Sequence, residues 1–303
     1  MNYQENCKIS ENREVEIYFD MAQQLYVDAA DRCDEIYDIA EDLTHGFQFI
    51  TESCILEDSR IIKILRYCTI PCLSQMKLGQ LVGLRTTANY EHQKIQTRLQ
   101  YSRLIKLAPG IANIISNNLD RNRFVWHNTD LDREQLQLAR HYAKQWTCSL
   151  IGNQNSITAF RNWRKDLQEN QIALAISQAG YIEVASRTTI RKITDLLPGQ
   201  YSRECRVQGH NIQKADFAIR LKKSKKLMLL EAKAIGVRID AFKRIKECRD
   251  KAQEWKNSFG ENFVFGAVLA GFIPISEVES LISSGHIVFW EHGLEEISQF
   301  LSE

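Results

Sequence analysis

Three charged side chains stand where their types and spacing could do chemistry together. Asp216 opens the segment DFAIRL, whereas Glu231 and Lys233 close the segment LMLLEAK. Because residues i and i+2 of a β-strand project to the same side, Glu231 and Lys233 would share one face. Two carboxylates that converge on one point repel each other unless a cation lies between them. If Asp216 comes beside Glu231, the pattern predicts a cation site with a lysine next to it.

The segment from Lys214 to Lys233 predicts two strands joined by a turn. Apolar residues that alternate with smaller or charged ones in its first half are Phe217, Ile219 and Leu221. This alternation is typical of a half-buried strand. The continuous apolar run at 227–230 is typical of a strand covered on both faces. The sequence KKSKK between them predicts a solvated hairpin turn, which would bring Asp216 next to Glu231.

Oxygen ligands of this kind suit Mg²⁺, which usually takes one or two carboxylates together with waters and phosphate oxygens. We therefore predict a Mg²⁺ site held by Asp216 and Glu231. Lys233 would lie beside the attacked phosphate, where it would stabilise negative charge or help to position or deprotonate a water. The predicted chemistry is metal-assisted hydrolysis of a phosphodiester. The alternative is a set of ordinary strand-end charges, because such a spacing also arises by chance.

The same stretch resembles the core motif of the PD-(D/E)XK nuclease superfamily, with Ala215 in place of the usual proline. A longer similarity covers about the last 150 residues and resembles the XamI-type restriction endonucleases. Its segments are LPGQYSRE (197–204), KADFAIRL, LEAK, the pair Lys243–Arg244, KAQEW (251–255) and IVFWEH (287–292).

The resemblance implies a Mg²⁺-dependent Type II restriction endonuclease that cuts double-stranded DNA at a fixed sequence. Two cuts at a palindrome imply a homodimer, and the cognate methyltransferase would act on the same site without needing to bind the protein. Two alternatives stay open. A nuclease with the same core would act in repair or phage defence without strict sequence choice, and an inert core would leave a DNA-binding protein.

The resemblance also implies a further carboxylate, because a helix before the first strand donates one in many superfamily nucleases. The candidates are Glu169, Glu183 and Glu204. We favour Glu204 as a fourth catalytic residue, because it lies in the YSRE segment that carries the resemblance. Its alternative role is a strand-edge charge paired with Arg203 or Arg206.

Basic residues around this core are the expected DNA contacts. In the resembled enzymes, the loop and helix after Lys233 approach DNA. The contacts implied here are Arg203, Arg238, Lys243 and Arg244. Arginine commonly reads guanine with two hydrogen bonds, whereas lysine more often holds phosphate.

The expected fold class is α/β, with a mixed central sheet sandwiched by helices and an N-terminal all-helical region. From about residue 158 the pattern predicts helix, three strands, helix, strand, helix, strand and helix. We expect residues 1–150 to form the helical region, for dimerisation or DNA recognition, and residues 151–303 to form the nuclease core. A composition of 44% hydrophobic and 25% charged residues is that of a soluble globular protein.

Several helix boundaries follow from apolar spacing and turn residues. We predict a long acidic helix over 14–45 and separate helices over 132–146 and 158–179. A turn is expected at Pro109-Gly110. The helix after the predicted site should begin at Asp240 as its N-cap. Its expected inner stripe is Phe242, Ile245, Cys248, Ala252 and Trp255.

The segment 73–84 could belong to a helix-turn-helix-like element, and it is followed by a basic stretch. The basic residues of that stretch are Arg85, Lys94, Arg98, Arg103 and Lys106. A role in DNA contact and a packed helical hairpin with a solvated basic face are both open for this region.

Charge is distributed unevenly along the chain, although the net charge is only +1. Residues 1–60 hold 4 Lys and Arg against 15 Asp and Glu, and residues 201–256 hold 16 against 7. This asymmetry favours a polyanion-binding face in the C-terminal part.

The eight cysteines form no C-x-x-C pair, so we expect reduced thiols. The sequence shows neither a signal-peptide pattern nor a run of ~20 apolar residues that could span a bilayer, so we expect the protein in the bacterial cytoplasm.

Overall fold

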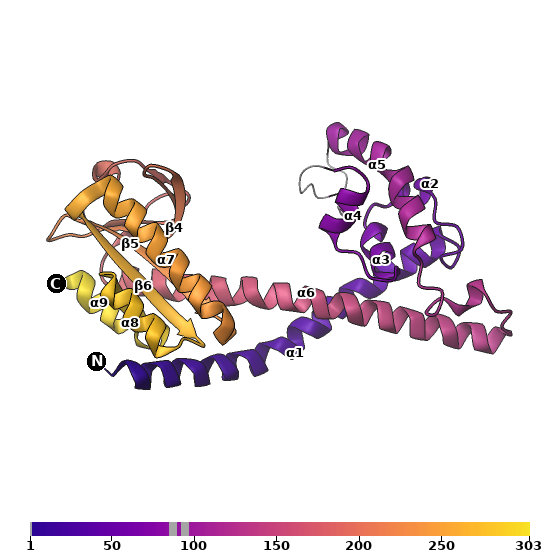
Figure 1. Ribbon diagram of the computed structural model, residues 1–303, viewed down its shortest axis with the longest axis horizontal. Coiled ribbons are helices and arrows are strands. Elements are labelled where there is room, and N and C mark those ends of the chain that lie inside the picture. The colour runs from indigo at the N-terminus through magenta and orange to yellow at the C-terminus, as the bar shows by residue number, and fades with distance from the viewer. Residues whose placement is uncertain (1, 85–89, 92–96) are drawn as a thin grey trace. The chain divides into compact units, whose positions relative to one another are not determined.

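The computed structural model describes residues 2–84, 90–91 and 97–303 (Figure 1). The chain forms two compact units. The sheet unit comprises residues 1–21 and 160–303, and the helical unit comprises residues 22–159. Arg85 and Lys94 of the predicted basic stretch lie outside the described residues.

Two long helices contribute residues to both units. They are α1 (Tyr3–Leu43) and α6 (Arg133–Gln178). The helical unit adds α2 (Glu52–Glu57), α3 (Ile61–Tyr67), α4 (Gln75–Leu81), α5 (Arg98–Asn117) and the 3₁₀ turn η1 (Val125–His127). Part of the acidic face of α1 is paired within this unit, because Lys144 Nζ lies 2.9 Å from Asp34 Oδ2 and 2.7 Å from Asp38 Oδ1. None of the described helices is both long and apolar enough to cross a membrane.

The two predicted helix breaks were wrong. Pro109 lies inside α5, whose apolar stripe is buried in the core of the helical unit. Burial of that stripe outweighs the local cost of a proline in a helix. Likewise, α6 runs unbroken where we predicted two helices. Gly152 within it allows close packing instead of a turn, because a Cβ there would lie 3.3 Å from Ala30 Cβ on α1.

A mixed sheet forms the centre of the sheet unit. Its strands are β1 (Ile182–Glu183), β2 (Thr189–Ile190), β3 (Gln200–Gln208), β4 (Ile212–Arg220), β5 (Leu227–Ile235), β6 (Phe263–Gly271) and β7 (Ile287–Trp290). They follow the order β1-β3-β4-β5-β6-β7, with β2 also paired to β3. Strands β3, β4 and β5 are antiparallel neighbours, whereas β5, β6 and β7 are parallel.

Helices cover both faces of this sheet, so the predicted fold class is confirmed. The helices after the site are α7 (Arg238–Phe259), α8 (Ile275–Ser283) and α9 (Glu295–Ser302), and the 3₁₀ turns are η2 (Ile193–Asp195), η3 (Gly260–Asn262) and η4 (Glu291–Gly293). Buried residues of α6 and α9 pack together with β4 and β5 in one core cluster. Residues of α7, α8 and the start of α1 pack against β6 and β7 in another. In Figure 1, α7 lies along β5 and β6.

The first turns of α1 belong to the sheet unit, so the consecutive ranges 1–150 and 151–303 do not coincide with the compact units. Cys7 is buried against the α7 and α8 side of the sheet. The hydroxyl oxygen of Ser10 accepts a hydrogen bond of 2.8 Å from the backbone N–H of Gly271, at the end of β6. All eight cysteines are free thiols, as expected.

The start of α7 differs from the prediction. The helix begins at Arg238 after Val237, so Asp240 lies in its first turn and is not the N-cap. Phe242 is 60% exposed, and Ala241 takes the buried position instead. Since the helix begins earlier and is anchored by Ala241 and Ile245, Phe242 lies on its outer side.

Candidate active site

The hairpin of β4 and β5 brings the two predicted carboxylates together. The pairing of the strands runs from Arg220↔Leu227 to Phe217↔Leu230. Asp216 and Glu231 directly follow this last pair, one on each strand. The turn between the strands occupies KKSKK, as predicted. The carboxylates therefore lie where regular pairing of β4 with β5 ends, while β5 stays paired to β6 along its whole length.

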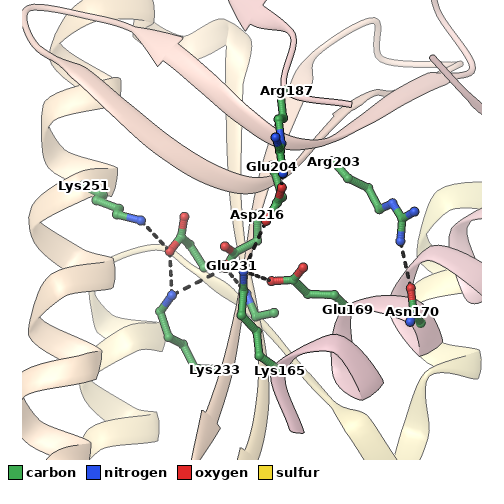
Figure 2. Close-up of polar contacts among 11 residues, drawn as sticks. Lys165, Glu169, Asn170, Arg187, Arg203, Glu204, Asp216, Glu231, Lys233 and Lys251 are labelled. Carbon is green, nitrogen blue, oxygen red and sulfur yellow. Dashed lines mark hydrogen bonds and ion pairs between the residues drawn. The ribbon is translucent and has the colours of Figure 1, made fainter. Parts of the chain in front are cut away.

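Lys233 lies between the two carboxylates (Figure 2). Its Nζ donates to Glu231 Oε2 at 2.7 Å and forms an ion pair with Asp216 Oδ2 at 3.5 Å. Asp216 is held further by the backbone N–H of Ala232, which donates to Oδ2 at 2.8 Å. The i and i+2 geometry thus places Lys233 on the same side as Glu231, as the sequence predicted.

The electrostatics of the site follow from burial and proximity. Burial of Lys233 opposes its positive charge, but the negative charges of Glu231 and Asp216 outweigh that cost and raise the pKa of Lys233. Glu231 is only 4% exposed at its side chain. Its Oε1 is buried and has no hydrogen-bond partner among the described residues. The site therefore presents one carboxylate oxygen that lacks a donor.

Lys251 of α7 is a further member of this cluster that the sequence did not single out. Its Nζ donates to Glu231 Oε2 at 2.8 Å (Figure 2). It also donates to the carbonyl oxygen of Lys214 at 2.8 Å. The only available signal was its place in the KAQEW segment, because 20 residues separate it from Glu231 along the chain.

The three candidates for a further carboxylate have different surroundings. Glu204 accepts hydrogen bonds from Lys165 Nζ at 3.3 Å and Arg187 Nε at 3.2 Å, and its side chain is 40% exposed. These bonds, first that of Arg187, lower the pKa of Glu204. Glu183 instead accepts a hydrogen bond of 2.9 Å from Arg203 Nε.

Glu169 on α6 is the most buried of the three, with a side chain 9% exposed. Burial raises its pKa, and the nearby negative charge of Asp216 raises it further. Lys165 Nζ lies 3.2 Å from Glu169 Oε1, so this lysine links Glu169 to Glu204. Glu204 also has a left-handed backbone with φ of 48°, which is costly for a residue other than glycine.

The four predicted DNA-contact residues all belong to the sheet unit, but they differ in whether another side chain already pairs with them. Arg203 is engaged, because it donates to Glu183 and, at 2.9 Å, to Asn170 Oδ1 (Figure 2). Arg238 is paired with Glu11 of α1. Lys243 is exposed on α7, and Arg244 is 56% exposed with Glu247 3.9 Å away.

The residues present fit a hard cation bound through oxygen. A buried carboxylate oxygen without a donor is costly unless another partner satisfies it. Among the described residues Glu231 Oε1 is such an oxygen, and Asp216 is linked to the same glutamate through Lys233. Within residues 2–84, 90–91 and 97–303, no three His, Cys, Asp or Glu side chains are grouped to hold a metal ion. Mg²⁺ commonly uses one or two carboxylates and completes its shell with water and phosphate oxygens.

Comparison with known protein families places the chain in a family. The family model described as XamI restriction endonuclease matches residues 46–290, which is well over half of the chain. No curated protein matches it. The matched range contains the β4–β5 hairpin with Asp216, Glu231 and Lys233 as well as all of α7. The chain therefore belongs to the XamI restriction endonuclease family, a family of endonucleases that act on DNA.

Proposed function

We propose that this protein is a Type II restriction endonuclease that hydrolyses phosphodiester bonds of double-stranded DNA at a fixed sequence and requires Mg²⁺. The observation that carries the proposal is the convergence of Asp216, Glu231 and Lys233 at the end of the β4–β5 pairing, in a chain of this family. Asp216 and Glu231 would hold the metal. Bound there, Mg²⁺ would polarise the phosphate and lower the pKa of a water.

The side chains of the chain have distinct tasks in this proposal. Glu231 offers the buried Oε1, to which none of the described residues donates, and Asp216 is oriented by the N–H of Ala232. Lys233 places an ammonium group beside both carboxylates, where it would stabilise the negative charge that develops on the phosphate or position a water. The burial of the cluster strengthens these interactions, because the effective dielectric constant is lower than in water.

The further carboxylate is better assigned to Glu169 than to Glu204 in this proposal. Glu169 is buried and feels the negative charge of Asp216, whereas Glu204 is 40% exposed and pairs with Arg187 in addition to Lys165, which both glutamates share. We expect Glu169→Gln to lower the cleavage rate by about 10–100-fold, as loss of a supporting ligand commonly does. Glu204→Gln should change it less than about threefold under the same conditions. Single-turnover cleavage of a labelled duplex measures both, and the opposite order would return the role to Glu204.

DNA is the proposed substrate, and the basic outer side of α7 is the proposed approach. Arg244→Ala should weaken DNA binding and reduce the slope of log K against log salt by about 1, because one phosphate contact is lost. Fluorescence anisotropy over a salt series measures this slope. Arg249→Ala is the matched control, since its guanidinium donates to Ser280 Oγ at 2.6 Å. An unchanged slope in Arg244→Ala would remove Arg244 from the interface.

A homodimer is part of the proposal, because two cuts at a palindrome call for two active sites related by a two-fold axis. Light scattering of the purified protein with and without DNA would measure its mass. The cognate methyltransferase would act on the same sequence in a bacterial cytoplasm and need not bind this chain.

The deciding experiment is plasmid digestion with and without Mg²⁺, run beside Lys233→Ala. Discrete fragments that need the metal and disappear in the variant would support the proposal, and sequencing their ends would give the site. A smear would favour a nuclease without sequence choice. Absence of cleavage with both Mg²⁺ and Mn²⁺, on unmethylated DNA, would favour an inert DNA-binding protein.

A further inference from the structure

Two lysines from different elements share one oxygen of Glu231. Lys233 Nζ of β5 and Lys251 Nζ of α7 both donate to Oε2, at 2.7 and 2.8 Å (Figure 2). The other oxygen, Oε1, is buried and has no hydrogen-bond partner among the described residues. One oxygen of the carboxylate thus accepts from two ammonium groups, and the other accepts from no group in the described part of the chain.

The two lysines differ in what else holds them. Besides Glu231, Lys233 is paired only with the other carboxylate of the proposed metal site, since its Nζ lies 3.5 Å from Asp216 Oδ2 among the described residues. Lys251 has anchors outside that pair. Its Nζ donates to the carbonyl oxygen of Lys214 at 2.8 Å and lies 5.9 Å from the ring centroid of the buried Trp255. Lys251 is therefore fixed by β4 and by its own helix.

We infer that Lys251 is a positioning residue that orients Glu231 toward the metal and releases Lys233 for the phosphate. This inference rests on the proposed function. A buried carboxylate oxygen that loses its only donor is destabilised. Since Lys251 keeps Oε2 paired, Lys233 can exchange Glu231 for a phosphate oxygen without leaving Oε2 bare. The same contact keeps the carboxylate turned so that Oε1 stays available as a ligand.

The test is Lys251→Met in the full-length protein, with Lys256→Met as the matched control on the same helix. Lys256 is exposed, and it is not part of the cluster. Calorimetry with Ca²⁺ or Mn²⁺ in the absence of DNA measures metal affinity, and single-turnover cleavage measures the chemical step. We expect Lys251→Met to weaken metal binding by about 10–100-fold and to slow cleavage similarly. The Kd for DNA in metal-free buffer should stay within about twofold, since no phosphate contact is lost.

Conservative replacement separates positioning from mere packing. Lys251→Arg should keep metal affinity within about threefold, because a guanidinium can still donate to Glu231 and to the carbonyl of Lys214. If Lys251→Met does not fold, as judged by circular dichroism, Lys251→Gln takes its place because it retains a donor of similar length. For this variant we expect a loss of metal affinity larger than that of the Arg variant, because a neutral donor holds a carboxylate more weakly than a charged one.

Three results would overturn the inference. Unchanged metal affinity in Lys251→Met would show that Lys251 does not orient Glu231. Weaker DNA binding with a smaller salt slope would make Lys251 a phosphate contact instead. A wild-type protein that binds no metal and does not cut DNA would refute the proposed function as well. In that case Asp216→Asn would give the same metal affinity and cleavage rate as the wild type, which distinguishes this outcome from a failure of the inference alone.

Discussion

Asp216→Asn should abolish DNA cleavage while leaving the fold and DNA binding intact. The variant keeps the shape of the side chain and an oxygen that can accept from Ala232, but it removes the charge beside Glu231. Metal-dependent stabilisation of charge in the transition state is worth several kcal/mol, so we expect the cleavage rate to fall by about 10³-fold or more. Single-turnover cleavage at saturating enzyme isolates this effect from binding.

Glu261→Gln is the control for this change, because it removes an exposed carboxylate of η3, outside the cluster. Its cleavage rate should match that of the wild type. Anisotropy with the same duplex in metal-free buffer should give a Kd for Asp216→Asn equal to or lower than that of the wild type, since a negative charge near the phosphates is removed. Cleavage at more than a tenth of the wild-type rate would remove Asp216 from the mechanism.

Arg164→Met should cause the largest loss of stability among single changes in the sheet unit. Arg164 of α6 is buried between two carboxylates, with Nε donating to Glu14 Oε2 at 2.8 Å and Nη1 donating to Glu291 Oε2 at 2.9 Å. This triad joins α1, α6 and the 3₁₀ turn η4, which follows β7. Breaking a buried ion pair leaves an uncompensated charge, so the free energy of unfolding should fall by about 3–5 kcal/mol. Thermal melting followed by circular dichroism should show a Tm lower by about 6–20 °C.

The loss of stability caused by Arg164→Met should become smaller as the pH falls. Burial raises the pKa of Glu14 above its ordinary value, and the positive charge of Arg164 opposes that rise. Without Arg164 the pKa of Glu14 would rise further, so the folded variant would take up a proton at a higher pH than the unfolded chain. A folded state that binds more protons gains stability as the pH falls, so the difference in stability from the wild type should shrink as the pH falls through the range in which Glu14 takes up its proton.

Arg161→Ala is the matched control, because Arg161 lies on the same helix but is exposed. Its Tm should stay within about 2 °C of the wild type. Replacing all three residues of the triad by apolar ones of similar size should restore much of the stability, because buried ion pairs often add little net stability. An unchanged Tm in Arg164→Met would mean that the triad does not hold α1 to the sheet unit.

The sequence alone determined the hairpin and the convergence of Asp216, Glu231 and Lys233. Alternating apolar residues define β4, a continuous apolar run defines β5, and the side of each charge follows from the two-residue period of a strand. These are local properties, set by neighbours in the chain. The order of the longer elements after residue 158 follows from the same patterns, but five strands precede α7 where three were predicted, because the two-residue strands β1 and β2 are too short to show a periodicity. The resemblance to the XamI family on the quoted segments is confirmed by the match over residues 46–290.

Only the tertiary structure decided which distant side chains join this cluster. Lys251 and Glu169 are brought to the hairpin by helices packed on the sheet, and no periodicity of the sequence specifies which turn of a helix faces a given strand. Packing also overrode local signals at Pro109 and Gly152, where buried helix faces outweigh residues that often end helices. The choice of Glu204 stays a prediction, beside a more buried Glu169. Local periodicity thus determines the strands and the side of each residue, whereas contacts between residues far apart in the chain depend on how the helices pack.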